Sequence, residues 1–92
     1  MKILQSGRFS RTIKKLSQQE KKLLDEAINV LVEKPEAGDV KVGDLYGVRV
    51  YKFKVNMDMR LLAYNHNKEA NTLTLLAYGS HENFYRDLKK SI

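Results

Sequence analysis

The chain contains no cysteine, and this absence removes several kinds of chemistry at once. Without thiols there can be no disulfide, no thiolate nucleophile and no zinc–thiolate site, and such a composition suits a reducing compartment. The five glycines form no phosphate-binding loop. Two histidines are present, His66 and His81, and without a helical His-x-x-x-His pair they do not predict a metal site.

Long apolar segments are also missing from the sequence. The apolar runs at 61–64 and 75–78 fall far short of the roughly 20 residues that a membrane-spanning helix requires. The first residues include no long apolar stretch and no small-residue cleavage site, which argues against a secretory signal. We therefore expect no membrane span and a cytoplasmic location.

Size and charge describe what the chain does have. With 92 residues, 42% of them hydrophobic, it can form one compact core but not two, so we expect a single domain over residues 1–92. Lys and Arg number 17 against 11 Asp and Glu, a formal net charge of +6. Such a charge favours association with phosphate backbones or acidic proteins, but it also serves as ordinary solvated surface.

The first third of the chain predicts a short strand and a short helix. Residues 3–5 are apolar enough for a brief edge strand, and Ser6 with Gly7 ends it. Phe9, Ile13 and Leu16 then recur at helical spacing with basic residues between them. This pattern indicates an amphipathic helix with a basic outer face.

A second helix is the most clearly marked element. Ser17 and Glu20 match a capping box, in which each side chain satisfies a free backbone amide of the other residue, so the helix is expected from about residue 18. Pro35 ends it, because the residue before a proline is pushed out of helical geometry. Its buried stripe is Leu24, Ala27, Ile28 and Leu31.

Three strands are predicted where the apolar period changes from helical to alternating. They cover residues 48–55, 60–64 and 72–78, joined by polar loops, and together predict an antiparallel meander. Gly79 is expected to end the last strand and Ser80 to cap a closing helix. The apolar stripe of that helix is expected at Phe84, Leu88 and Ile92.

This order of elements predicts an α+β domain of two layers, with helices on one face of the sheet and the other face partly open. Alternation places Tyr51 and Phe53 under the helices, and Lys52 and Lys54 together on the open face. Arg49 points away from these lysines unless a bulge re-aims it. Paired lysines on a strand suit a polyanion, but they are also a common guard against aggregation.

His81 and Tyr85 are the most interesting pair of polar residues. On a helix their spacing of four puts imidazole and phenol on one face, with Arg86 nearby. Cleavage of RNA requires activation of a ribose 2′-hydroxyl, stabilisation of charge on phosphorus and protonation of the departing oxygen, and such groups can supply these without a metal. The alternative is structural: His81 helps Ser80 to cap the helix, and Tyr85 packs beside Phe84.

Four stretches, 43–54, 61–64, 73–77 and 79–89, together resemble the RelE/ParE superfamily of bacterial type II toxins. The most specific parts are Tyr-Lys-Phe-Lys at 51–54 and Gly-Ser-His-Glu-Asn-Phe-Tyr at 79–85. The resemblance implies a helical hairpin packed on a twisted antiparallel sheet of three to four strands, followed by a short C-terminal helix.

The resemblance also implies a function and partners. It implies a cognate antitoxin that wraps the toxin in a hetero-oligomer and, for RelE-like members, ribosome-dependent cleavage of mRNA without metal or cofactor. ParE-like members poison DNA gyrase instead, and a third alternative is a non-catalytic module that binds RNA or antitoxin. The lysines and the His–Tyr pair favour RNA cleavage, since a pure protein binder has no evident need of a proton-transfer pair.

The RNA contacts implied by the resemblance are basic. Lys52 and Lys54 match paired lysines that lie against the RNA on the corresponding RelE strand. Arg49 and Arg86 are further candidates for holding phosphate.

The resemblance implies catalytic roles for three residues. His81 occupies a position where relatives have arginine or histidine and is implied to act as general acid or base. Tyr85 corresponds to an aromatic residue that flanks the reacting nucleotide. Arg60 is the candidate transition-state clamp, but it precedes Tyr64 by four residues where RelE has three, which reverses its strand parity.

Overall fold

The computed structural model describes residues 1–41, 47–80 and 84, and in this part of the chain the fold is α+β, with two helices and a five-stranded mixed sheet. No helix among these residues is long and apolar enough to cross a membrane. The elements in chain order are β1 (Lys2–Gln5), α1 (Gly7–Ile13), α2 (Gln18–Glu33), β2 (Asp39–Val40), β3 (Arg49–Val55), β4 (Asp58–Asn67) and β5 (Thr72–Ser80).

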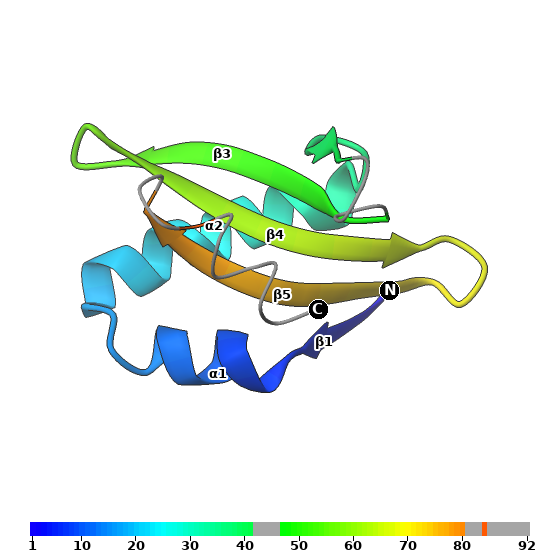
Figure 1. The fold of residues 1–92 in the computed structure, drawn as a ribbon, viewed down its shortest axis with the longest axis horizontal. Coiled ribbons are helices and arrows are strands. Elements are labelled where there is room, and N and C mark those ends of the chain that lie inside the picture. Colours follow the sequence, from blue (N-terminus) through cyan, green and yellow to red (C-terminus); the bar gives the residue numbers. More distant parts are fainter. Residues whose placement is uncertain (42–46, 81–83, 85–92) are drawn as a thin grey trace.

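The sheet has the strand order β1-β5-β4-β3-β2 (Figure 1). The predicted antiparallel meander of β3, β4 and β5 is confirmed. The prediction of a purely antiparallel sheet of three to four strands is wrong, because β1 pairs with β5 in parallel and β2 adds two residues beside β3. Both edge strands are short. The partner of β1 lies about seventy residues away in the sequence, so no local pattern predicts this parallel pairing.

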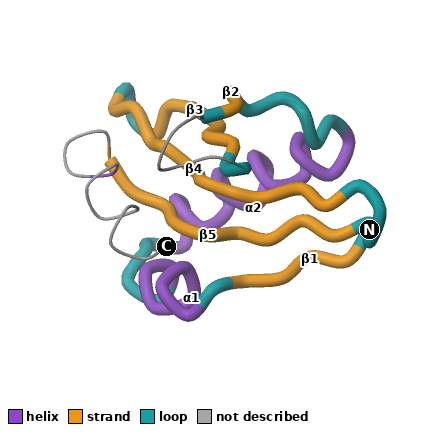
Figure 2. Tube along the Cα trace, turned by 45° about the vertical axis from the view of Figure 1, so that its right-hand side comes forward, coloured by secondary structure: helices purple, strands orange, loops and turns teal. Residues whose placement is uncertain are grey.

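The two helices occupy different places on the sheet. In Figures 1 and 2, α2 runs behind the strands, whereas α1 lies along β5 on the side where β1 pairs. The helices therefore follow one another as predicted, but α1 packs against β5 while α2 contacts β3. Helix α1 also ends earlier than the apolar pattern suggested, although Leu16 beyond it still packs against the core.

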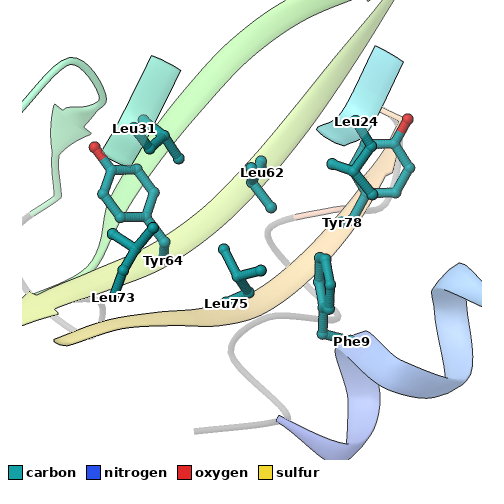
Figure 3. Packing of buried hydrophobic residues seen from close by; sticks show 8 residues of the cluster. All are labelled: Phe9, Leu24, Leu31, Leu62, Tyr64, Leu73, Leu75 and Tyr78. Atoms are coloured by element: carbon teal, nitrogen blue, oxygen red, sulfur yellow. The ribbon is translucent and has the colours of Figure 1, made fainter. Parts of the chain in front are cut away.

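The main core lies between the helices and one face of the sheet (Figure 3). It combines residues from both helices with residues from the two central strands, so both layers depend on it. Each large side chain fully buried there contributes on the order of 2 kcal/mol. The buried members are Phe9, Leu24, Leu31, Leu62, Tyr64, Leu73, Leu75 and Tyr78.

A second, smaller cluster covers part of the opposite face. Its members come from the strands, from Val48 just before β3 and from Phe84, so the face predicted to be partly open has an apolar section. Strand β4 is buried on both sides as a result, which explains its continuous apolar run. The cluster consists of Val48, Val50, Leu61, Ala63, Ala77 and Phe84.

Tyr64 fastens the end of α2 to the centre of the sheet. Its hydroxyl donates to the Pro35 carbonyl at 2.6 Å and accepts from the Gly38 amide at 2.9 Å. A Cβ on Gly38 would lie 2.7 Å from the Tyr64 hydroxyl oxygen, so only glycine allows this approach. Burial raises the pKa of Tyr64, with the Gly38 hydrogen bond opposing it.

The strand ends differ from those predicted. Asn56 and Met57 both have positive φ, as a two-residue type I′ turn requires, so Asp58 already belongs to β4. Strand β4 continues to Asn67, because its last residues pair with the start of β5 where a polar loop was expected. Gly79 does not end β5, and Ser80 is a strand residue and not a helix cap, because both pair with β4.

Ser6 joins the start of α1 to an irregularity in β5. Its hydroxyl accepts from the Phe9 amide at 3.1 Å and donates to the Leu76 carbonyl at 2.7 Å. Leu76 is the extra residue of a β-bulge, since Ala63 pairs with Ala77 while Tyr64 pairs with Leu75. One hydroxyl thus caps the helix and satisfies a carbonyl that the bulge leaves out of the ladder.

Glu20 links α2 to the sheet through its carboxylate. The predicted N-cap is confirmed, because the Ser17 hydroxyl accepts from the Glu20 amide at 3.1 Å. The Glu20 carboxylate, however, accepts from the Tyr78 hydroxyl and from Arg60 Nε, the latter at 3.2 Å. Burial, the Glu20 hydrogen bond and the Glu20 charge raise the pKa of Tyr78.

The two helix caps should differ in their effect on stability. Ser6→Ala removes a cap and the bond to the Leu76 carbonyl, and should lower the free energy of unfolding by about 2 kcal/mol. Ser17→Ala removes a cap only and should cost about 1 kcal/mol. Urea denaturation of both variants measures the difference, and equal losses would contradict the role given to the bulge.

Alkaline pH should weaken the protein through Tyr78. Because its folded pKa lies above the ordinary value of 10.0, its contribution is complete below about pH 10 and is lost as the pH rises through the folded pKa. Above pH 10, the free energy of unfolding of the wild type should fall more steeply than that of Tyr78→Phe, by up to about 1.4 kcal/mol per pH unit. Urea melts between pH 8 and 11 test this, and parallel curves would contradict it.

Candidate nucleic-acid interface

Lys52 lies on the sheet face that is turned away from α2. It pairs with Leu61, which pairs with Gly79, and directly paired residues point to the same side of a sheet. Leu61 belongs to the second cluster, which fixes the side. Because Lys52 is exposed, its ammonium group is available to a ligand on that face.

Lys54 has the same parity as Lys52 and is also exposed. Its side chain, however, also lines a groove on the α2 side of β3, together with Leu23, Ala27 and Val30. Strand β2 pairs only with the first two residues of β3, so Lys54 stands near the sheet edge, from which its long side chain can reach either surface.

Arg49 lies on the opposite face of the sheet from Lys52 and forms hydrogen bonds within the fold. Its Nη1 donates to the carbonyls of Glu36 at 3.3 Å and Gly38 at 2.9 Å. Strand alternation indicated this direction, and the structure does not bring Arg49 to Lys52.

Arg60 is likewise separated from Lys52. It pairs with Phe53, which packs against the main core, and it forms an ion pair with Glu20. Burial lowers the pKa of Arg60, but the hydrogen bond and charge of Glu20 outweigh this and raise it, so the guanidinium stays charged. Arg60 therefore lies on the helix side of the sheet, on the other face from Lys52.

The remaining predicted site residues, His81, Tyr85 and Arg86, lie outside the described residues, as do Leu88 and Ile92 of the predicted closing helix. Ser80, the last described residue before His81, ends β5 and pairs with Arg60. Strands lie about 4.8 Å apart, so Ser80 is about two strand spacings, roughly 10 Å, from β3. His81 follows Ser80 directly in the sequence.

The structure adds a pocket that the sequence did not predict. It measures about 270 Å³ and is lined by α1 and the last part of β5. The basic outer face of the first helix was visible in the sequence, but nothing local showed that this helix lies beside β5. The lining residues are Arg8, Thr12, Ala77, Tyr78, Gly79, Ser80 and Phe84.

Metal binding finds no support in the described segments, 1–41, 47–80 and 84. No three His, Asp or Glu side chains gather there closely enough to hold an ion. The predicted site residues within these segments supply ammonium and guanidinium groups, which can act on an anion.

Solved structures similar to this chain are bacterial proteins. The free state of an E. coli RelE toxin variant has a TM-score of 0.76 at 14% identity, covering 98% of this chain and 90% of its own. RelE in the E. coli RelBE toxin–antitoxin complex has a TM-score of 0.70 at 18% identity, covering 88% and 96%. A conserved hypothetical protein of Helicobacter pylori is 27% identical, with a TM-score of 0.57 and coverage of 88% and 94%. At such identities the likeness shows the fold.

Sequence comparison gives the family. No curated protein sequence matches the chain. A family model described as ParE-like toxin of type II bacterial toxin–antitoxin system matches residues 3–89, and this confirms the predicted resemblance to the RelE/ParE superfamily. Because the match covers nearly the whole chain, the protein belongs to the ParE-like toxins of type II bacterial toxin–antitoxin systems.

Proposed function

We propose that this toxin is a metal-independent, ribosome-dependent endoribonuclease that cleaves mRNA. The observation that carries the proposal is the position of Lys52, exposed on the face away from α2 and in one row with Gly79. His81, two residues after Gly79 in the sequence, is the proposed proton-transfer group. Lys52 and Gly79 lie two strand spacings apart, about 10 Å, a distance that one nucleotide and its phosphate can bridge.

The proposed reaction divides its tasks among few groups. One member of the His81–Tyr85 pair takes the proton from the ribose 2′-hydroxyl, and the 2′-oxygen attacks phosphorus to form a cyclic phosphate. The P–O bond to the 5′-oxygen breaks, and this oxygen takes up a proton supplied by the other group. Lys52 and Lys54 stabilise the negative charge that builds up on the phosphate oxygens.

The arginines have different places in this proposal. Arg86 remains a candidate for holding phosphate, since it follows Tyr85 directly. Arg60 could act as a clamp only after leaving Glu20, and Arg49 only after leaving the Gly38 carbonyl. We therefore assign the first phosphate contacts to Lys52 and Lys54.

Two partners follow from the proposal. The substrate is mRNA on the ribosome, and the inhibitor is a cognate antitoxin, because the family consists of toxins from toxin–antitoxin systems. The solved RelBE complex contains such an antitoxin bound to a toxin of this fold.

Gyrase inhibition is the second candidate, favoured by the ParE-like name of the matching family. The two functions leave different traces in a cell that expresses the toxin. Mapping 5′ ends on translated messages reveals mRNA cleavage, whereas intact messages with double-strand DNA breaks reveal gyrase poisoning. The second result would overturn our proposal.

His81→Ala tests the proton transfer. The variant should lose toxicity and mRNA cleavage by at least about 100-fold, the usual contribution of a general acid or base. Antitoxin affinity, measured by titration, should stay close to that of the wild type, which shows that the fold persists. Undiminished killing by this variant would eliminate the proposed role.

Lys52→Gln with Lys54→Gln tests the phosphate contact. Loss of two cations should weaken RNA binding about 10- to 100-fold and reduce its dependence on salt by about two charges. Lys22→Gln is a control, because Lys22 is an exposed lysine on α2, away from this face. Fluorescence anisotropy at several salt concentrations measures both effects, and equal losses in test and control variants would refute a specific contact.

A further inference from the structure

The pocket between α1 and β5 opens on the same sheet face as Lys52. Gly79 lines it and shares a row with Leu61 and Lys52, one residue on each of three adjacent strands. Two strand spacings separate the Cα atoms of Lys52 and Gly79 by about 10 Å. Arg8 on α1 borders the pocket, so the row ends in a cation at each side.

Gly79 creates the hollow by lacking a side chain. Among described atoms, a Cβ at this position would meet only Phe84 Cδ1, at 3.8 Å, which is ordinary contact. The pocket of about 270 Å³ is slightly smaller than the roughly 300–1,000 Å³ of sites that enclose a whole small molecule. Its size therefore suits one part of a larger ligand, such as a single nucleotide unit of a strand.

The lining indicates which group the pocket takes. Among the described residues that line it, Arg8 is the one charged residue and none is acidic. The Arg8 guanidinium forms no ion pair or hydrogen bond with described residues, whereas the Thr12 hydroxyl is already used by donating to the Arg8 carbonyl. A guanidinium with free donors binds phosphate in a two-point geometry that an ammonium group cannot reproduce.

The positive surface continues beyond the pocket. A shallow depression on α1 is lined by Arg8, Arg11, Thr12, Lys14 and Lys15, again without an acidic residue. The first acidic residue of the chain is Glu20, so nothing before it neutralises these charges. Such a continuous cationic path suits an extended polyanion better than an isolated small anion.

We propose that the pocket binds one phosphate, with its nucleotide, of the single-stranded RNA that Lys52 contacts, and that Arg8 binds this phosphate. The inference rests on the proposed ribonuclease function and deepens it, because it gives the substrate strand a direction across the sheet, from β3 over β4 and β5 to α1. Arg8 is then a substrate-binding residue beside the end of β5, on the other side of the row from Lys52.

Arg8→Gln is the principal test. It should weaken binding of a short single-stranded RNA about 10-fold and lower the salt dependence by about one charge, as expected for loss of one phosphate contact. Lys22→Gln, with the same change of charge on α2, should change affinity less than about twofold. Fluorescence anisotropy measures both variants against the wild type.

A second variant fills the pocket without changing its charge. Gly79→Val places a β-branched residue, which strands favour, in the hollow. It should weaken RNA binding while the melting temperature shows that the fold is retained; Gly79→Ala, whose Cβ makes only ordinary contact, serves if valine perturbs the fold. Oligonucleotides in which single phosphates are replaced by neutral methylphosphonates locate the contact. At one position only, the replacement should weaken RNA binding by the wild type but leave binding by Arg8→Gln unchanged.

The outcomes separate this inference from the function on which it rests. If Lys52→Gln with Lys54→Gln weakens RNA binding but the Arg8 and Gly79 variants behave like Lys22→Gln, the pocket is refuted and the ribonuclease proposal stands. If the wild type binds no RNA, both fail together. Loss of affinity in both sets, with one methylphosphonate position insensitive in Arg8→Gln, supports the strand path.

Discussion

The hydrogen bond from the Ser6 hydroxyl to the Leu76 carbonyl holds the β-bulge that decides which residues of β5 face each side of the sheet. The bulge at Leu76 shifts the alternation of β5 by one residue. Before it, Leu73 and Leu75 pack into the main core; after it, Tyr78 does so while Gly79 turns to the other face (Figure 3). Without that shift, Gly79 would face α2, and no hollow would lie in the row with Lys52.

The same shift joins the two layers electrostatically. It brings Tyr78 to Glu20, whose carboxylate also holds Arg60, so α2 is tied to β4 and β5 through one acidic group. Arg60 on the helix side is thus neutralised within the fold, whereas Lys52 on the opposite face forms no ion pair with described residues. Part of the free positive charge of this +6 chain therefore lies on the face of Lys52, where a polyanion can approach.

Features with a local cause could be predicted from the sequence. Ser17 caps α2 because its hydroxyl reaches an amide three residues away, and Lys52 faces away from α2 because strands alternate. Features set by distant contacts could not be predicted in this way. Strand β1 pairs with β5, and Arg8 and Gly79 line one pocket, only after the chain has folded.

Ser6 and Leu76 are separated by most of the chain, and this has a consequence for how the protein is made. A contact of such high sequence separation forms late in folding, and synthesis proceeds from the N-terminus. Until residues 72–76 have left the ribosome, β1 has no partner strand and the Ser6 hydroxyl has no Leu76 carbonyl to bind. An incomplete polypeptide therefore carries Arg8 and Lys52 without the sheet that places them at the two ends of one row, and this arrangement arises only when translation of the toxin is nearly finished.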